Sequence, residues 1–390
     1  MDRTAFPHLP ASTPFLIDPS AQAVCQALEV AGHVAYFVGG CVRNAIMNEP
    51  QSDIDIATDA VPAETMRVAT EAGLRCIPTG EDHGTITVVV DAVPFEVTTF
   101  RRDVATDGRR AVVAFSTDIA EDARRRDFTM NALYADRSGL IIDPLGGLPD
   151  AQSRTVRFIE DPAARIREDY LRILRYFRFH AWYADRTAGW DPSALAGIAG
   201  NLDGLDTLSA ERVGAEVLKL LSAPDPVPAV SVMHQTGVLA HILPGAVPDF
   251  LGPLVHLEEL SGAVVDPLTR LAALGGADAL DRLRLSRKAA KQLDATRTHM
   301  ASTLQLRALG HVAGPAAGVG ALLLRSAMAR QHVGPGDIDL VLQGAGTDFP
   351  VAARDLATLS GPALGERLNT LKERWIASDL SLTKNDLLAS

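Results

Sequence analysis

The order of apolar and polar positions divides the chain into a strand-containing first part and a helical remainder. Residues 34–38 are a short apolar run, which is typical of a buried strand. Residues 53–58 alternate between polar and apolar side chains, the period of a half-buried strand. Two runs, 84–91 and 94–100, flank a tight turn and predict a hairpin. These patterns end near residue 143, so we expect one domain of mixed strands and helices.

Helix signals dominate the rest of the sequence. Asp161-Pro162 places an N-cap residue before a proline at the first helical position, which predicts one long helix over 161–185. Asp191-Pro192 repeats this arrangement, and Ser209 is a candidate cap for a helix over 210–221. Further helices are predicted at 42–47, 62–72, 225–239, 266–274 and 286–306, with Gly- and Pro-rich breaks near 222–228, 243–253, 308–320 and 333–337.

The composition excludes several classes of protein. Apolar residues make up 47% of the chain, too many for a disordered polypeptide. Cys25, Cys41 and Cys76 lie far apart without metal-binding spacing, which excludes a disulfide scaffold and argues against zinc. The N-terminus has no basic stretch followed by an apolar core, and no run of about 18 apolar residues occurs. We therefore expect a cytoplasmic protein without a membrane partner.

The charge of the chain is uneven. There are 37 basic and 48 acidic side chains, and the net charge of −11 by itself argues against a nucleic-acid partner. Between Arg101 and Arg186, however, the sequence has 16 arginines, no lysine and 14 acidic residues. Arginine favours bidentate contacts to phosphates or base edges, although solvated helix faces with internal ion pairs have the same composition. A second basic stretch lies at 281–293.

A glycine turn is the first candidate for chemistry. Gly39 and Gly40 follow the predicted strand 34–38, and glycine lets backbone amides approach a phosphate without a Cβ in the way. Arg43 comes three residues later, at the start of a helix whose dipole also favours an anion. The turn therefore predicts a phosphate site, although an ordinary tight turn would have the same residues.

A pair of carboxylates follows the turn. Asp53 and Asp55 are two residues apart on the predicted strand 53–58, so we expect both on one face. Their repulsion is costly unless a cation relieves it. Magnesium prefers one or two carboxylates together with phosphate oxygens, so the pair predicts a catalytic Mg²⁺ site. An exposed acidic edge strand is the alternative.

These residues carry a resemblance to a known family. GG-x-x-R followed by D-x-D resembles the polymerase-β superfamily of nucleotidyltransferases, and more narrowly the class II tRNA nucleotidyltransferase/poly(A) polymerase family. Asn44 stands where the family usually has Asp, which loses a charge beside the triphosphate site. The string RRRDFTMNAL at 124–133 resembles the family's RRDFTxNA motif. The resemblance implies that Arg126 binds the triphosphate, while Asp127 and Asn131 hold backbone or ribose.

The segment 167–179, REDYLRILRYFRF, resembles a third family motif. Asp169, Arg172, Arg175 and Arg178 recur every three residues and predict one polar stripe along a helix. Cytosine and adenine both offer an amino donor beside a ring-nitrogen acceptor, which an Asp169–Arg172 pair complements, whereas uracil and guanine present the reverse order. Arg175 and Arg178 are expected to orient this pair or to contact phosphate. An ordinary salt-bridged amphipathic helix is the alternative.

Two flanking segments refine the comparison with the family. Residues 98–115 are polar and rich in Arg and predict a long mobile loop, which in the family accompanies the switch from C to A addition. Glu96, just before it, is a candidate third carboxylate near the metal. The segment 208–221 resembles a further family motif and is expected to brace the recognition helix through Ser209, Glu211, Arg212 and Glu216.

The resemblance implies an α+β fold with an N-terminal mixed-sheet, polymerase-β-like nucleotidyltransferase head and an all-α neck, body and tail. The expected boundaries are 1–143 for the catalytic head, 144–223 for the neck with the base-recognition helix, 224–310 for the body and 311–390 for a tail that binds tRNA.

The implied activity is template-independent addition of CCA to the 3′ end of tRNA. It would use CTP, ATP and Mg²⁺, release pyrophosphate, and be carried out by a monomer or homodimer without zinc. A poly(A) polymerase of the same family is the alternative enzyme. A non-catalytic RNA-binding protein would lack one of the paired aspartates, and a small-molecule nucleotidyltransferase would not need RRRDFTMNAL.

Overall fold

The chain folds into two compact units, residues 1–208 and 209–390. The computed structural model describes residues 7–81, 84–106 and 111–389. The boundary between the units falls inside the neck predicted at 144–223, so the base-recognition segment and the motif at 208–221 lie in different units.

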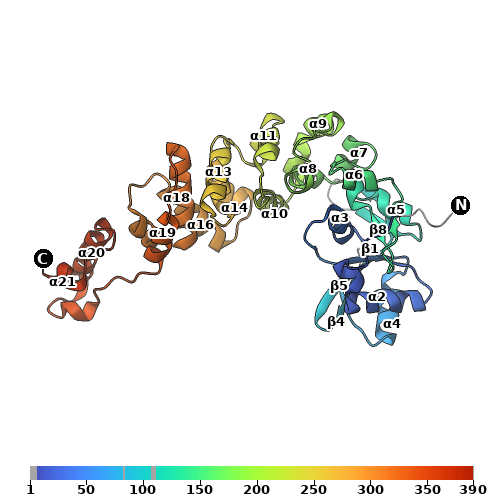
Figure 1. Cartoon of the computed structure of the whole chain (residues 1–390), viewed down its shortest axis with the longest axis horizontal. Coiled ribbons are helices and arrows are strands. Elements are labelled where there is room, and N and C mark those ends of the chain that lie inside the picture. The colour runs from blue at the N-terminus through green and yellow to red at the C-terminus, as the bar shows by residue number, and fades with distance from the viewer. Residues whose placement is uncertain (1–6, 82–83, 107–110, 390) are drawn as a thin grey trace. The chain divides into compact units, whose positions relative to one another are not determined.

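A seven-stranded mixed sheet forms the centre of the first unit (Figure 1). Its order is β3-β4-β5-β2-β1-β8-β9, with β2 parallel to β5 and the other neighbouring pairs antiparallel. The predicted mixed-sheet head is therefore confirmed. The strands are β1 Ala35–Val38, β2 Asp55–Thr58, β3 Arg75–Gly80, β4 Thr85–Val90, β5 Val93–Thr99, β8 Tyr134–Ala135 and β9 Ile141–Ile142.

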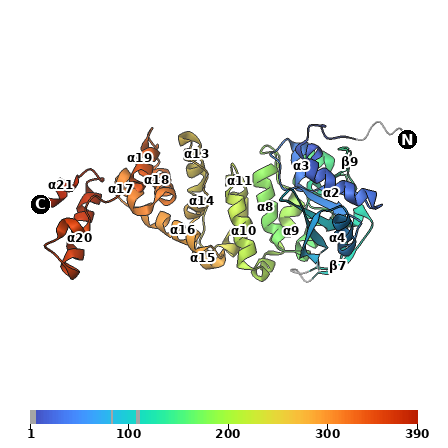
Figure 2. The same cartoon turned by 90° about the horizontal axis from the view of Figure 1, so that it is seen from below.

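Helices α2 and α4 pack against this sheet (Figures 1 and 2), since both contact its strands and each other. Phe37, Ile56 and Phe95 are buried in the core beside them. The helical elements of this unit are α1 Pro14–Ile17, α2 Pro19–Val30, α3 Gly40–Met47, α4 Pro62–Glu71, α5 Ile119–Arg124, η3 Thr129–Asn131, α6 Leu148–Gln152, α7 Pro162–Glu168, α8 Leu171–Tyr183, α9 Pro192–Ala199 and η4 Leu202–Thr207.

The hairpin predicted from 84–91 and 94–100 is present as β4 and β5. Its two turn residues, Asp91 and Ala92, both have positive φ, 48° and 66°. This is the backbone twist that suits a two-residue hairpin, although it is usually supplied by Gly or Asn.

The predicted loop at 98–115 is wrong. Residues there form a second, two-stranded sheet of β6, Arg101–Thr106, and β7, Ala111–Phe115. Residues 107–110 between the strands lie outside the described part of the chain. The continuous apolar run AVVAF in β7 is the signal for a strand that the polar composition of the whole segment masked.

The single helix predicted for 161–185 is also wrong. The structure has two helices, α7 and α8, separated by Asp169 in an extended conformation with φ −151° and ψ 105°. The Asp169 carboxylate accepts a hydrogen bond from the Leu171 amide at 3.1 Å and so starts the second helix. Asp169 therefore lies beside α8 and does not belong to its helical stripe.

The described residues of the second unit form helices and their connections, with one isolated β-bridge between Ala246 and Gly275. Gly237, with φ 83°, breaks the predicted helix 225–239 into α11 and α12, and α16 ends seven residues earlier than predicted, at His299. The helical elements are α10 Ala210–Leu221, α11 Val227–Gln235, α12 Val238–Ile242, α13 Leu251–Ser261, α14 Pro267–Leu274, α15 Ala279–Arg282, α16 Arg287–His299, α17 Leu306–Ala313, α18 Pro315–Ala329, α19 Asp337–Ala345, η5 Ala353–Leu356, α20 Gly361–Ala377 and α21 Lys384–Leu388.

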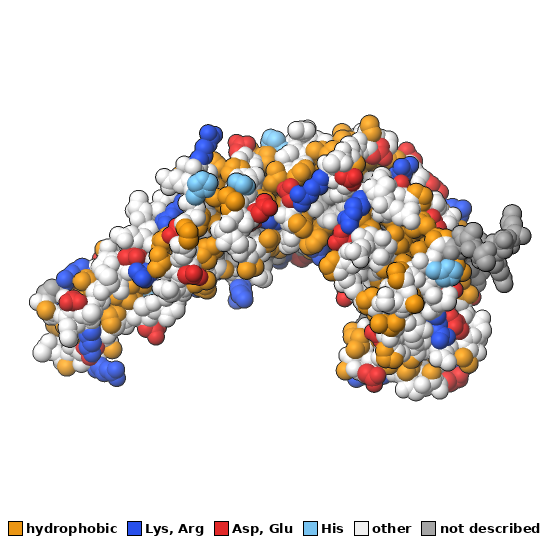
Figure 3. Space-filling model, in the orientation of Figure 1, with side chains coloured by type: hydrophobic (Ala, Val, Ile, Leu, Met, Phe, Trp, Pro, Cys, Tyr) orange, Lys and Arg blue, Asp and Glu red, His pale blue; other side chains and the backbone are white. Residues whose placement is uncertain are grey.

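On the face shown in Figure 3, charged side chains of both signs are interspersed with apolar ones.

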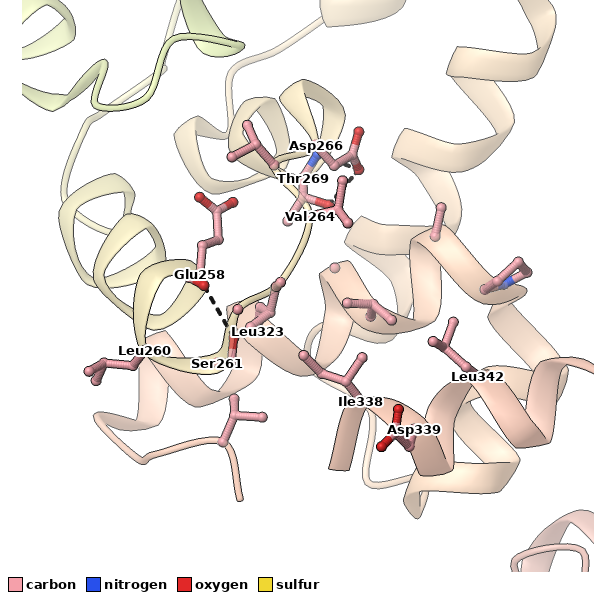
Figure 4. Close-up of a pocket in the computed structure, with 18 of the residues that line it drawn as sticks. Glu258, Leu260, Ser261, Val264, Asp266, Thr269, Leu323, Ile338, Asp339 and Leu342 are labelled. Atoms are coloured by element: carbon pink, nitrogen blue, oxygen red, sulfur yellow. Dashed lines mark hydrogen bonds between the residues drawn. The ribbon is translucent and has the colours of Figure 1, made fainter. Parts of the chain in front are cut away.

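Within the second unit, a cavity of about 780 Å³ lies between the α13–α14 connection, α18 and α19 (Figure 4). Val264, Leu323 and Ile338 line it, with Asp266 at its edge. Over the described residues, no helix combines the length and the apolar character that crossing a membrane requires.

Candidate functional site

The glycine turn lies where β1 meets α3. Gly39 has φ 70° and forms the N-cap of α3, a conformation that glycine adopts without strain. A Cβ at Gly39 would lie 3.3 Å from Nη1 of Arg126, and one at Gly40 would lie 2.8 Å from Oγ of Ser52. The turn therefore brings backbone close to Arg126, the arginine that the sequence assigned to the triphosphate.

Three carboxylates gather beside this turn. Asp55 opens β2 and is paired in register with Glu96 on the parallel strand β5. Burial raises the pKa of Asp55 to about 6, and the negative charges of Glu96 and Asp53 add to this, while the positive charge of Arg126 opposes it. Asp53 lies just before β2, so the prediction that both aspartates belong to the strand is wrong.

This set of side chains fits a divalent cation. The Asp55 carboxylate is half-buried and its pKa is raised, so a cation beside it would stabilise its charged form. Among the described residues, no three His, Cys, Asp or Glu side chains are grouped tightly enough to hold a metal ion by themselves. The arrangement suits magnesium, which takes one or two carboxylates and draws its other ligands from phosphates and water.

Arg43 is buried and fixed from several directions. Its guanidinium donates to Asn131 Oδ1 at 2.5 Å and to the Tyr183 hydroxyl at 2.9 Å, and it lies 4.1 Å from the Tyr183 ring centroid. Burial lowers the pKa of Arg43. The side chain thus joins α3 to η3 and α8 and does not extend into an open pocket.

Asn44, the departure from the family pattern, completes the contacts of Arg43. Its Oδ1 accepts hydrogen bonds from Nε and Nη2 of Arg43 at 3.1 and 2.7 Å. Its Nδ2 donates to the Pro50 carbonyl at 2.6 Å, on the segment that leads to Asp53. An aspartate here would accept the arginine bonds but would place a second oxygen against the Pro50 carbonyl. The amide therefore suits both neighbours.

The RRRDFTMNAL segment forms a hydrogen-bonded chain across the unit. Asp127 accepts from Asn131 Nδ2 at 2.9 Å and from Arg175 Nε at 2.7 Å, and Asn131 in turn accepts from Arg43. Burial raises the pKa of Asp127, but the positive charge of Arg175 and the Asn131 hydrogen bond leave it lowered to about 2. Asp127 and Asn131 are predicted to hold backbone or ribose, and in the structure their contacts link Arg43 to α8.

The predicted base-reading residues lie around the α7–α8 junction. Arg172 is 8% exposed and donates to Glu168 at 2.7 Å and to the carbonyls of Arg165 and Arg125 at 2.8 and 2.7 Å. Glu168, which sequence reasoning did not single out, also pairs with Arg165. Its position four residues before Arg172 was the available signal.

Arg178 lies farther along α8, with its guanidinium carbon 4.6 Å from the Phe179 ring centroid. The structure therefore brings Arg43, Arg126, Asp127 and Arg175 into one connected region with the glycine turn.

The motif at 208–221 lies in the second unit, where the Ser209 hydroxyl caps α10 and Glu211 pairs with Arg284 at 3.4 Å. Its predicted bracing of the recognition helix stays a prediction.

The chain matches known proteins along most of its length. A family model of the poly A polymerase head domain matches residues 35–157, and one of the probable RNA and SrmB-binding site of polymerase A matches 191–249. The mitochondrial CCA tRNA nucleotidyltransferase 1 of Mus musculus is 32% identical over 381 residues, 92% of this chain and 86% of the relative. The CCA-adding enzyme of Lacticaseibacillus paracasei is 33% identical over 383 residues, 93% of this chain and 92% of the relative.

A solved structure agrees with these sequence matches. The crystal structure of the Bacillus stearothermophilus CCA-adding enzyme in complex with CTP superposes with a TM-score of 0.71 at 27% identity, over 92% of this chain and 93% of that one.

Proposed function

The chain belongs to the family of CCA-adding tRNA nucleotidyltransferases, and on that premise we propose that it adds C, C and A to the 3′ end of tRNA from CTP and ATP, releasing pyrophosphate. The observation that carries the proposal is the placement of Asp55, Glu96 and Arg126 beside the Gly39 turn. Carboxylates that could hold a metal, next to a cationic group that could hold phosphate, are what transfer of a nucleotidyl group requires.

Asp53 and Asp55 are the residues that would hold magnesium, with Glu96 beside them. A divalent cation held by these carboxylates would supply positive charge to offset that of the triphosphate and to make the 3′-hydroxyl of the RNA a better nucleophile. The amides of the Gly39-Gly40 turn and the Arg126 guanidinium bind phosphate oxygens. These donors stabilise the charge that moves to the departing pyrophosphate.

Base selection is assigned to Asp169 and Arg172. Arg172 is held by Glu168 and by the Arg125 carbonyl, so its position is set before a nucleotide arrives. An accepting carboxylate and a donating guanidinium match the edges of cytosine and adenine and oppose those of uracil and guanine. Arg175, tied to Asp127, keeps this region joined to the glycine turn through Asn131 and Arg43.

Binding of tRNA is assigned to the helical regions, with the tail at 311–390 as one contact. The proposed division into head, neck, body and tail keeps the boundaries 143, 223 and 310. A poly(A) polymerase is the second candidate, because the matching head model is described by that activity. Both activities would use the same head, so the product decides between them.

The test is nucleotide addition to a tRNA transcript that lacks its 3′ CCA, with magnesium and all four nucleotides, resolved on a sequencing gel. Extension that stops after C-C-A supports the proposal, and the Asp53→Ala variant should give no product in the same assay. A long adenosine tail would move the assignment to poly(A) polymerase. A bound but unextended tRNA would contradict an enzymatic role.

A further inference from the structure

Asp122 is a buried carboxylate that none of the sequence motifs singled out. It lies near the end of α5 and is 1% exposed. Oδ1 accepts from Nε of Arg125 at 2.8 Å, and Oδ2 accepts from Nη2 of Arg126 at 3.0 Å and from the Tyr134 hydroxyl at 2.8 Å. One carboxylate thus holds two consecutive arginines of the RRRDFTMNAL segment.

The charge on Asp122 is stabilised in place. Burial raises its pKa, but the positive charges of Arg126 and Arg125 and the Tyr134 hydrogen bond outweigh burial and leave the pKa lowered to about 2. Asp122 therefore stays ionised at every pH at which the protein would work, and both arginines keep a charged partner.

The first contact of Asp122 leads to the phosphate site. The Arg126 guanidinium binds Asp122 through Nε and Nη2 and lies 5.4 Å from the Tyr134 ring centroid. Its Nη1 is the atom nearest to the Cβ position of Gly39, at 3.3 Å. Asp122 and Tyr134 thus hold one side of Arg126, and the remaining nitrogen faces the glycine turn.

The second contact leads to the base-reading region. Asp122 fixes the Arg125 side chain, and the Arg125 carbonyl accepts from Nη2 of Arg172 at 2.7 Å. The preceding carbonyl, that of Arg124, accepts from Nη1 of Arg165, which shares Glu168 with Arg172. The backbone on which the base-reading arginine rests is therefore the same segment that Asp122 anchors.

We propose that Asp122 is a positioning residue that places the triphosphate-binding arginine and the base-reading arginine in one common geometry. The inference rests on the proposed function, because it assigns a nucleotide to these arginines. Asp122 itself contacts no substrate. Its loss would loosen both ends of the nucleotide together, whereas loss of Tyr134 would loosen only the Arg126 end.

The test combines Asp122→Asn with Arg126→Ala in a double-mutant cycle on the full chain. Asp122→Asn keeps the shape but loses the charge-assisted bonds, so KM for CTP and for ATP should each rise about 10-fold. Incorporation of UMP relative to CMP should rise by a similar factor, while the affinity for tRNA stays within about twofold. In the Arg126→Ala background, Asp122→Asn should leave KM unchanged and still relax selectivity.

Two variants separate positioning from folding. Asp118→Ala removes the N-cap of the same helix, since Asp118 accepts from the Ala120 amide at 2.8 Å, without touching either arginine. It should lower the melting temperature and leave KM and selectivity alone. Tyr134→Phe should raise KM about threefold without relaxing selectivity, and it carries the cycle if Asp122→Asn fails to fold.

Three results would overturn the inference: KM effects of Asp122→Asn and Arg126→Ala that multiply in full, an Asp118→Ala profile that reproduces that of Asp122→Asn, or unchanged selectivity in Asp122→Asn. Failure of the underlying function is distinguishable. If Arg126→Ala alone leaves KM for both nucleotides unchanged, the triphosphate assignment is wrong, and the role proposed for Asp122 is wrong with it.

Discussion

Each unit pairs arginine with a buried carboxylate, and the two pairings differ in their surroundings. In the first unit, Asp122 receives Arg125, Arg126 and the Tyr134 hydroxyl. In the second, Glu258 receives Arg270, through Nε at 2.9 Å and Nη2 at 2.7 Å, and both side chains are almost fully buried.

The pKa values of the Asp122 and Glu258 carboxyl groups are shifted in opposite directions. The Asp122 pKa is lowered to about 2, because its several donors outweigh burial. The Glu258 pKa is raised by burial, since Arg270 offsets only part of that cost. Arg270 also donates to the carbonyls of Leu221 and Ala223 at 2.8 and 2.5 Å, where α10 ends. In the second unit, the arginine–carboxylate pair therefore satisfies carbonyls at the C-terminal end of α10. In the first unit, we propose that the corresponding pair positions Arg125 and Arg126.

Asp53→Ala should have the largest effect of the variants considered, and that effect should be confined to the first unit. Losing a carboxylate of the metal site should lower the rate of CMP addition by ~10³-fold, since a metal contributes several kcal/mol to such a step. Single-turnover extension of tRNA measures it, with filter binding to show that tRNA affinity is kept. Asp203→Ala, an exposed aspartate in the same unit, is the control. Near-normal extension by Asp53→Ala would refute the metal assignment.

Arg270→Ala is the counterpart in the second unit. It leaves Glu258 buried and unpaired, so the free energy of unfolding should fall by about 3–5 kcal/mol. Urea denaturation followed by hydrogen exchange of second-unit peptides measures the loss. The double variant Glu258→Leu/Arg270→Met should lose less, because no charge is left unpaired. A loss below about 1 kcal/mol would show that the pair is dispensable.

The start of α16 offers a test of RNA binding by the second unit. Arg287, Lys288 and Lys291 are exposed in its first two turns, where the helix dipole disfavours cations, and the first turn has no acidic residue. Replacing all three with Glu should weaken tRNA binding about 10–100-fold at low salt and reduce the slope of log affinity against log salt by about 2–3.

Glutamine at the same three positions is the matched control for this charge reversal. It removes the positive charges without adding negative ones, so it should give an intermediate slope. KM for CTP should stay unchanged in both triples. An unaltered salt dependence would place the RNA contacts elsewhere.

Asp169→Asn tests base selection in the first unit. An amide can both donate and accept, so the variant should accept uracil more readily and lose about 10-fold in the preference for CTP over UTP. Competition between the two nucleotides at the first added position measures this. Arg178→Lys is the comparison, because it keeps a positive charge on α8 and leaves Asp169 unchanged. Unchanged preference in Asp169→Asn would argue against its pairing with the base.

The smallest effect concerns pH. Burial lowers the pKa of His180 to about 4, with Asp191 opposing, and its ring stacks 3.8 Å from that of Trp190. Because the folded-state pKa lies below the ordinary 6.5, the unfolded chain takes up the proton first. The stabilisation is therefore complete above about pH 6.5 and is lost as the pH falls towards 4. The half-buried ring makes about 1 kcal/mol a realistic loss.

Hydrogen exchange of α8 peptides across this pH range measures the loss of stability. His180→Phe should abolish this pH-dependent loss while keeping the ring stacked on Trp190. The Glu258 carboxyl in the second unit should respond with the opposite sign. The raised folded-state pKa of Glu258 means that a falling pH relieves part of its burial cost. Parallel acid responses of the α8 peptides and of the α13 peptides that contain Glu258 would contradict the comparison.

Local sequence was sufficient for much of this architecture. Asp161, Asp191 and Ser209 each cap the helix that they were expected to cap, since capping depends on residues only two or three positions away. The glycine turn and the β4–β5 hairpin were likewise predicted from residues close together in the sequence. At 98–115, the polar composition of the whole segment was weighed above the apolar run at 111–115, and the predicted loop was wrong.

The sequence named candidate residues for the site but not the contacts among them. Asp169 belongs to a motif that reads as one helix, yet its own side chain ends the regular pattern by bonding to the Leu171 amide. The expectation for Arg43 was a phosphate contact. Its contacts with Tyr183 and Asn131 come from segments about 140 and 88 residues away, which no local pattern reports.

The sequence by itself determined the family, the residue types of the proposed nucleotide site and the positions of most helices, because motifs and caps are encoded by near neighbours. Only the tertiary structure decided which charges meet. Asp122 carries no motif of its own, and it reaches Tyr134 on β8 only because the sheet packs against α5. The balance between burial and nearby charge, which lowers the pKa of Asp122 and raises that of Glu258, exists only once the chain is folded.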